Sequence, residues 1–72
     1  MGYNKQTFRL AAKDSRGNAI DLPARMTCFY GPSLDEVRYV ARGIVIGLHA
    51  KYKKPRVEIW DADTDALILI QQ

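Results

Sequence analysis

A capped helix in the second half of the chain is the feature that most constrains the fold. Ser33-Leu34-Asp35-Glu36 is typical of a capping box, in which the Ser hydroxyl accepts from a backbone N–H and the Glu carboxylate reaches back to the N-cap. Pro32 disfavours helical backbone at Gly31, and Lys53-Lys54-Pro55 supplies a basic last turn and a stop. The sequence therefore predicts one helix of roughly five or six turns between these signals.

Strand patterns precede this helix. Residues Thr7 to Lys13 alternate between apolar and more polar positions with a period of two, which is typical of a half-buried strand. A turn cluster at Asp14–Asn18 follows. A second strand is expected within Ile20–Tyr30. Because Pro23 is tolerated only at an edge, a strand start or a bulge, the pairing part of that strand is predicted as Ala24–Tyr30.

Strand patterns also follow the helix. Arg56–Trp60 alternates, Asp61–Asp65 is a polar turn, and Ala66–Ile70 is a short apolar strand. The sequence predicts an α+β fold of ββαββ order, with an antiparallel sheet and one long helix packed on one face. Residues 1–72 are expected to form a single small domain, with residues 1–6 flexible.

The composition narrows the class of protein. An apolar fraction of 47% and a charged fraction of 26% are those of a globular chain rather than a disordered one. The single Cys28 excludes an internal disulfide. The N-terminus has no signal-peptide core, and no apolar run approaches the roughly 20 residues of a membrane span. We therefore expect a cytoplasmic protein that does not act on a membrane.

Residues with catalytic or metal-binding chemistry are sparse. Asp61, Asp63 and Asp65 alternate as in the opening of a calcium loop, but Ala66 and Gln72 stand where such a loop has Gly and Glu, so a hairpin turn is expected. The only histidine, His49, has no carboxylate one helical turn away, and Cys28 is expected in the core. No phosphate loop or nucleophile elbow is found. We expect neither an enzyme nor a bound cofactor, metal or small-molecule substrate.

The helix carries more apolar surface than one sheet contact requires. At about 100° per residue, one stripe forms an evident core face, comprising Leu34, Val37, Ala41, Ile44, Val45, Leu48 and Tyr52. An arc elsewhere on the helix is small or apolar where a helix on one sheet should be polar. This arc is a candidate protein interface, formed by Tyr39, Val40, Gly43, Ile46, Gly47 and Ala50.

Two interpretations of the arc stay open. Two glycines four residues apart favour close approach of another backbone, as in small-xxx-small helix contacts, and predict a homodimer or another protein partner. The alternative is a helix that crosses its own sheet tightly at Gly43.

The open face of the sheet could also meet a partner, or be a solvated face with scattered apolar side chains.

The charge distribution suggests a second function class. No acidic residue occurs from Val37 to Val57, although this stretch holds six cations. These cations either complement the helix dipole or form a basic stripe (Arg38, Arg42, His49 and Lys53) for an acidic partner. Arg and aromatic residues on an open sheet face are typical of single-strand binding, although Glu58 lies among them. The nucleic-acid candidates are Arg9, Arg25, Phe29, Arg38, Arg42, Lys53, Arg56 and Trp60.

The order of elements carries a resemblance. Strand, turn, strand with internal Pro23, then Ser33-Leu34-Asp35-Glu36 opening a helix, then a strand, resembles very small phage host-modulating proteins such as the T7-type phage inhibitor of host RNA polymerase. The long basic helix and the strand Ala66–Ile70 depart from that pattern. The resemblance implies an interaction module that binds a large host protein. The expected function is non-enzymatic protein binding with self-association, and nucleic-acid binding is the alternative.

Overall fold

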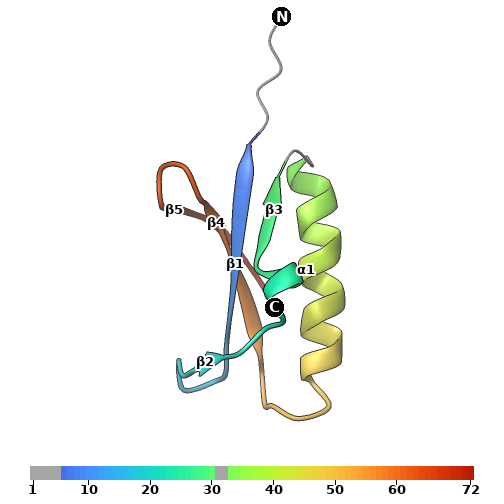
Figure 1. The fold of residues 1–72 in the computed structure, drawn as a ribbon. Coiled ribbons are helices and arrows are strands. Elements are labelled where there is room, and N and C mark those ends of the chain that lie inside the picture. Colours follow the sequence, from blue (N-terminus) through green and yellow to red (C-terminus); the bar gives the residue numbers. More distant parts are fainter. Residues whose placement is uncertain (1–5, 31–32) are drawn as a thin grey trace, which may run out of the picture.

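The computed structural model describes residues 6–30 and 33–72. Of the segment 1–6 that was expected to be flexible, residues 1–5 lie outside the described residues, and so does the expected effect of Pro32 on Gly31. Figure 1 shows one helix lying along one face of a twisted sheet. The elements in chain order are β1 (Thr7–Lys13), β2 (Ala19–Ile20), the short 3₁₀ helix η1 (Ala24–Met26), β3 (Cys28–Tyr30), α1 (Leu34–Leu48), β4 (Arg56–Asp61) and β5 (Ala66–Gln71).

The sheet is antiparallel and is built around β1 and β4. Its strand order is β2-β1-β4-β5, and β3 pairs with the same edge of β1 as β2 does, further along the strand. Along the central pair, Arg9 lies opposite Trp60 and Ala11 opposite Glu58. The expected α+β fold with one helix on one face of an antiparallel sheet is confirmed.

The second predicted strand is wrong in part. Cys28–Tyr30 does pair with β1, but Ala24–Met26 forms η1 instead of strand. The cause is Pro23, whose φ of −55° opens a tight turn in which its carbonyl accepts from the Met26 N–H at 2.8 Å. The turn divides the expected strand, and Ala19–Ile20 pairs separately with the far end of β1. The described sheet therefore has five strands rather than four.

The start of α1 is confirmed in atomic detail. The Glu36 N–H donates to Ser33 Oγ at 3.3 Å, and the Ser33 N–H donates to Glu36 Oε2 at 3.2 Å, which completes the capping box. These two reciprocal bonds satisfy N–H groups that have no partner within the helix. The N-terminal boundary is therefore a property of the local sequence.

The predicted end of the helix is wrong. α1 stops at Leu48 with fifteen residues, and Tyr52 and Lys53 lie in the connection to β4 rather than on the helix. The Leu48 carbonyl accepts from the N–H groups of Lys51 and Tyr52, and Lys54 adopts a positive φ of 47°. Because β4 starts at Arg56, directly after buried Pro55, the intervening residues are needed to carry the chain back to the sheet.

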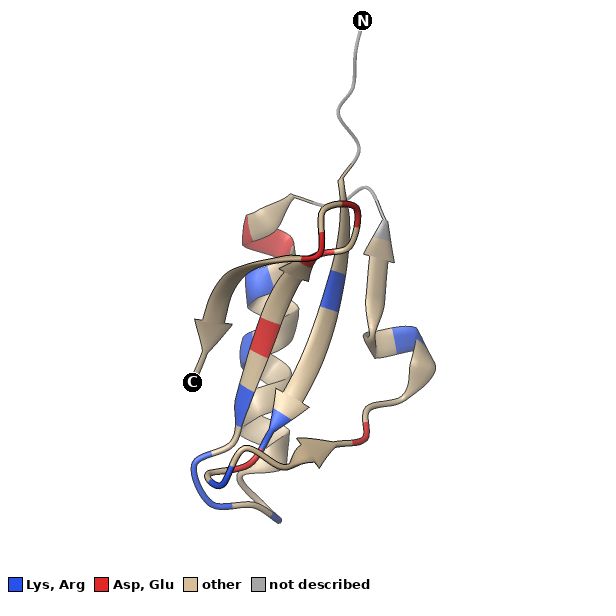
Figure 2. Cartoon of the chain, turned by 90° about the vertical axis from the view of Figure 1, so that its left-hand side faces the viewer, with Lys and Arg blue, Asp and Glu red and all other residues tan. Residues whose placement is uncertain are grey.

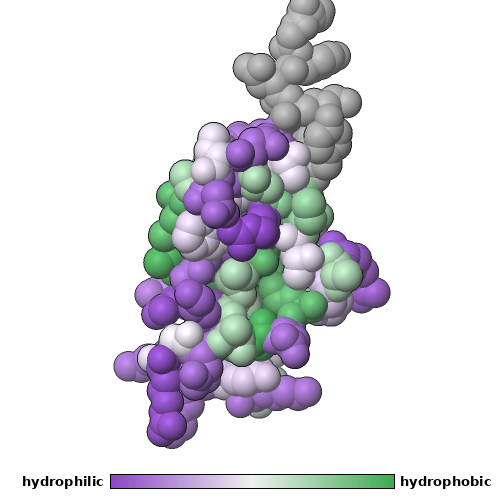
Figure 3. All heavy atoms as spheres, turned by 60° about the vertical axis from the view of Figure 1, so that its left-hand side comes forward, coloured by the Kyte–Doolittle hydropathy of each residue, from purple (hydrophilic) through white to green (hydrophobic). Residues whose placement is uncertain are grey.

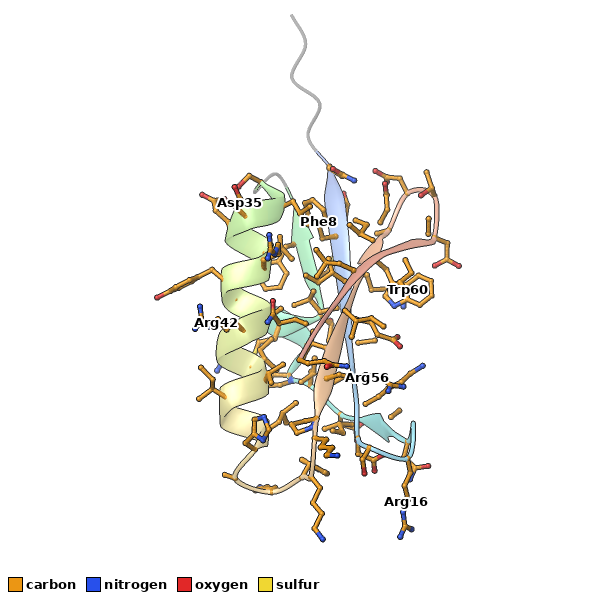
Figure 4. The ribbon with its side chains drawn as sticks, turned by 180° about the vertical axis from the view of Figure 1, so that it is seen from behind. Phe8, Arg16, Asp35, Arg42, Arg56 and Trp60 are labelled. Carbon is orange, nitrogen blue, oxygen red and sulfur yellow. The ribbon has the colours of Figure 1, made fainter. Side chains whose placement is uncertain are left out.

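The core lies between α1 and the helix-facing side of the sheet. The predicted alternation of β1 is confirmed, since Phe8, Leu10 and Ala12 are all buried. Figure 4 shows Phe8 between the sheet and the helix. The other buried apolar residues come from the second strand, the helix and the central strand β4, namely Ile20, Val37, Ala41, Val45, Val57 and Ile59.

The two faces of β3 are the reverse of those predicted. Phe29 lies opposite Phe8 and packs against the core, whereas Cys28 lies opposite Arg9 and is exposed. The prediction assumed one unbroken strand from Ala24, with Met26 and Cys28 on the same face. The turn at η1 changes the phase of the alternation, so a period-two extrapolation across it fails.

Candidate interaction surfaces

The outward side of α1 carries large apolar side chains in solvent. Tyr39 is 80% exposed and Ile46 is 66% exposed, and Gly43, Gly47 and Ala50 are exposed beside them. We call Tyr39, Gly43, Ile46, Gly47 and Ala50 the outer helix face, although Ala50, which was predicted on the helix, lies in the turn directly after α1. Val40, the remaining residue of the predicted arc, borders this face. It is half-buried and packs against the core, so it is not counted as part of the outer helix face.

The glycines of this face meet nothing within the chain. A Cβ built at Gly43 or at Gly47 has no heavy atom within 4 Å among its non-local neighbours. The alternative interpretation, in which the helix crosses its own sheet tightly at Gly43, is therefore wrong. Each interior glycine still costs about 0.8–1 kcal/mol relative to alanine, without a compensating contact in the single chain.

An apolar groove adjoins the outer helix face. It has a volume of about 450 Å³ and runs between α1 and the segment that holds η1. Figure 1 shows η1 beside the middle of α1. Leu22, Pro23 and Met26 form one wall, and the helix side includes Gly43 and Gly47. The far wall of this groove was missed from the sequence, because nothing local to Leu22 or Met26 indicates which side of the helix they approach.

The acidic residues of α1 lie at its start, and the cations lie along its exposed flank and in the loop after it. Asp35 and Glu36 occupy the first turn, Arg38 and Arg42 follow on an exposed flank, and Lys51, Lys53 and Lys54 lie in the loop after the helix. Figure 2 shows the acidic start of the helix and the basic loop at its opposite end. The predicted basic stripe is thus partly on the helix and partly in the following loop, with His49 at the C-cap.

The open face of the sheet holds an internally paired charge network. Glu58 is only 7% exposed; its carboxylate accepts from Trp60 Nε1 at 3.2 Å and lies 3.3 Å from Lys13 Nζ. The Arg9 guanidinium lies 5.2 Å from the centre of the Trp60 ring and 2.7 Å from the Asp65 carboxylate. Two of the cations on this face are therefore already neutralised within the chain.

This network bears on the nucleic-acid candidates. Figure 4 shows Trp60 on the side of the sheet away from α1, and Arg9 and Arg56 share that side through their pairing with β4 and β1. Two candidates are not there: Phe29 faces the core and Arg25 lies on η1. Arg38, Arg42 and Lys53 belong to the helix side. The eight predicted residues thus do not form one surface.

Apolar side chains also remain on the open sheet face. Leu67 is 45% exposed and Ile70 is 43% exposed, both on the edge strand β5. Figure 3 shows hydrophobic atoms at the left edge of the molecule and a second hydrophobic group near its middle, with hydrophilic atoms between the two. The sheet face is therefore mixed rather than one continuous apolar patch.

The acidic hairpin between β4 and β5 is organised by its first carboxylate. Asp61 accepts from the backbone N–H groups of Asp63 at 2.9 Å and Thr64 at 3.3 Å, and from Gln6 Nε2 at 2.9 Å. These bonds, that of Asp63 foremost, lower the pKa of Asp61. The predicted hairpin turn is confirmed. Among residues 6–30 and 33–72, no group of three His, Cys, Asp or Glu side chains could hold a metal ion.

The two residues singled out for possible chemistry lie at the surface. His49 lines a shallow hollow with Ser15, Lys54 and Arg56, and it is exposed as predicted. Cys28 is exposed, so its predicted place in the core is wrong. Across the described part of the chain, no helix has the length and apolar character needed to cross a membrane.

Comparisons with protein-family models, curated proteins and solved structures found no significant match. The fold and its surfaces are therefore the basis for a functional proposal.

Proposed function

We propose that this chain is a non-enzymatic protein-binding module and that the outer helix face is its binding surface. The exposure of Tyr39 and Ile46 is the observation that carries the proposal. Full burial of a large apolar side chain contributes roughly 1.5–3 kcal/mol, so covering these two side chains offers a substantial gain. A partner that covers them also meets the smooth backbone at Gly43 and Gly47.

The glycines support a protein partner in particular. Each lowers helix stability, and the surrounding space would accept a methyl group without collision. Small residues let a second backbone approach a helix closely, which is an advantage only when another polypeptide packs there. The adjoining groove extends the same apolar surface towards Leu22 and Met26.

The buried carboxylate supports a non-enzymatic role. The two carboxylate oxygens of Glu58 contact Trp60 Nε1 and Lys13 Nζ, so they belong to a structural network rather than face a substrate pocket. The partner classes in this proposal are a second copy of the chain and a host protein. The latter follows from the resemblance to small phage proteins.

Nucleic-acid binding is the second candidate, and the basic helix flank favours it. Arg38 and Arg42 are exposed and form no ion pair with the described residues, and further cations lie in the loop beyond the other end of α1. The open sheet face supports it less. Arg9 covers Trp60 and is itself paired with Asp65, so a base would have to displace both contacts to stack.

Site-specific photo-crosslinking tests the proposal. p-Benzoylphenylalanine replaces Tyr39 in the tagged full-length chain, expressed in the cells that naturally make it. The matched control carries the same probe at exposed Arg16, which lies in the turn after β1, well away from the outer helix face (Figure 4). We expect light-dependent, nuclease-resistant protein adducts from position 39 and not from position 16. Absence of adducts at position 39, or adducts that nuclease removes, would overturn protein binding at this face.

A further inference from the structure

We infer that the occupant of the outer helix face is a second copy of this chain, with the two α1 helices antiparallel and crossing at Gly43. This inference rests on the proposed function, because it names the partner for the same surface. It is carried by the distribution of large, small and charged residues along one side of α1.

The helix geometry centres this surface on Gly43. At about 100° per residue, Glu36, Tyr39, Val40, Ile46 and Gly47 all fall within about 60° of the Gly43 direction. A two-fold axis beside Gly43 makes the contact isologous, so that the same patch meets itself. Each residue after Gly43 then lies level with the partner residue the same number of positions before it. Tyr39 is therefore level with Gly47 of the second copy.

A large side chain and a matching hole occur on this one surface. Gly43, Ile46, Gly47 and Ala50 have the i, i+3, i+4, i+7 spacing of the four residues that surround a knob in helix packing; the first three lie on α1 and Ala50 lies in the turn directly after it. Three of the four are small, so the hole is wide enough for a phenol ring. In the antiparallel arrangement the exposed Tyr39 of the second copy enters it, and both copies make the same contact.

The crossing point requires glycine. Packed helices have axes about 8–10 Å apart, and each Cα lies about 2.3 Å from its axis. Residues that face each other at the two-fold axis then have Cα atoms only about 3–5 Å apart. That separation leaves no room for two side chains. The space over Gly43, which is open in the single chain, would be filled by the backbone of the second copy.

The charges select the antiparallel orientation. Asp35 and Glu36 are exposed at the start of α1, and Lys51 and Lys53 are exposed just beyond its end. An antiparallel pair places the acids of each copy beside the basic loop of the other, with Asp35 level with Lys51. It also opposes the two helix dipoles favourably. A parallel pair would bring acid to acid and base to base.

Cysteine pairing across the contact tests both the partner and the orientation. Purified full-length Tyr39→Cys and Gly47→Cys chains, each with exposed Cys28 replaced by Ser, are oxidised separately and as a mixture. We expect a disulfide-linked dimer from the mixture only. In each chain alone the two identical positions lie eight residues apart along the pair, about 12 Å, beyond disulfide reach. Circular dichroism confirms that each variant is folded.

Two controls sharpen the result. Arg38→Cys in the same background lies off the contact surface and should cross-link in no combination. Asp35→Lys should weaken dimerisation several-fold in sedimentation experiments, and adding Lys51→Glu should restore it, because each dimer contains two such pairs.

The possible outcomes distinguish self-association of the chain from binding of a different protein at the same face. Cross-linking of Tyr39→Cys with itself would overturn the antiparallel orientation while leaving self-association in place. A monomer at high micromolar concentration without mixed cross-links would overturn the second copy as partner. In that case, photo-adducts between the probe at position 39 and a different protein would still support protein binding at this face.

Discussion

Substituting Gly43 by alanine separates the stability of the single chain from the stability of the pair. In the single chain the new methyl group meets open space, and Gly43 has ordinary helical backbone. Alanine gains about 0.8–1 kcal/mol over glycine inside a helix, mainly because glycine loses more backbone freedom on folding. For a domain of this size the gain corresponds to a rise in melting temperature of about 4–8 °C.

The free energy of unfolding is measured by urea denaturation at low micromolar protein concentration, so that the single chain rather than the pair is observed. Gly17→Ala is the matched control, because its added Cβ also meets open space but its φ is +84°. That left-handed conformation disfavours alanine by roughly 1–2 kcal/mol, so the control should be destabilised. Destabilisation by Gly43→Ala in dilute solution would refute the reasoning, since it would reveal a close contact within the single chain.

The same substitution should act in the opposite direction on association. Two methyl groups at the crossing point would hold the helices apart, so the dimer dissociation constant should rise while the single chain becomes more stable. Sedimentation velocity over a concentration series measures this effect. Unchanged association in Gly43→Ala would place the crossing elsewhere on the helix.

Three further outcomes are expected. Ser33→Ala removes half of the capping box and should lower the unfolding free energy by about 1 kcal/mol; an unchanged melting temperature would contradict a helix start at this residue. The lowered pKa of Asp61 means that its stabilising bonds are fully present above the unfolded-state pKa near 4 and are lost as the pH falls through the folded value. Asp61→Asn should therefore reduce the loss of stability below about pH 4 in thermal unfolding. Single-stranded oligonucleotides should leave the fluorescence of Trp60 unchanged at physiological salt, and micromolar quenching there would favour nucleic-acid binding instead.

The features that could be predicted from the sequence are those determined by near neighbours. The capping box needs only Ser33 and Glu36, and the structure contains both of its hydrogen bonds. The alternation of β1 needs only its own residues and an apolar side to face, and Phe8 and Leu10 are buried as expected. Residues of the outer helix face were found in the same way, because the helical period alone decides which side Tyr39 occupies.

The errors have tertiary causes. The end of α1 depends on how far the chain must travel to reach β4, which no signal at Leu48 reveals. The faces of Cys28 and Phe29 depend on a turn that changes the phase of the strand. The groove wall at Leu22 depends on where η1 lies against α1. Each of these features depends on how distant segments are placed relative to one another, and a local sequence pattern does not contain that information.

The two sides of the molecule use their charges differently, and this difference argues for the helix as the contact surface. On the open sheet face, neighbouring strands bring Lys13 to Glu58 and Arg9 to Asp65, so opposite charges are paired within one chain. On the helix side, Asp35 and Lys51 are separated by more than about 20 Å along the axis and cannot reach each other. Within one chain Asp35 shares a surface hollow with Arg38 and Arg42, without an ion pair to either among the described residues. The antiparallel copy inferred above would bring each Asp35 close to the distant Lys51 of the other copy.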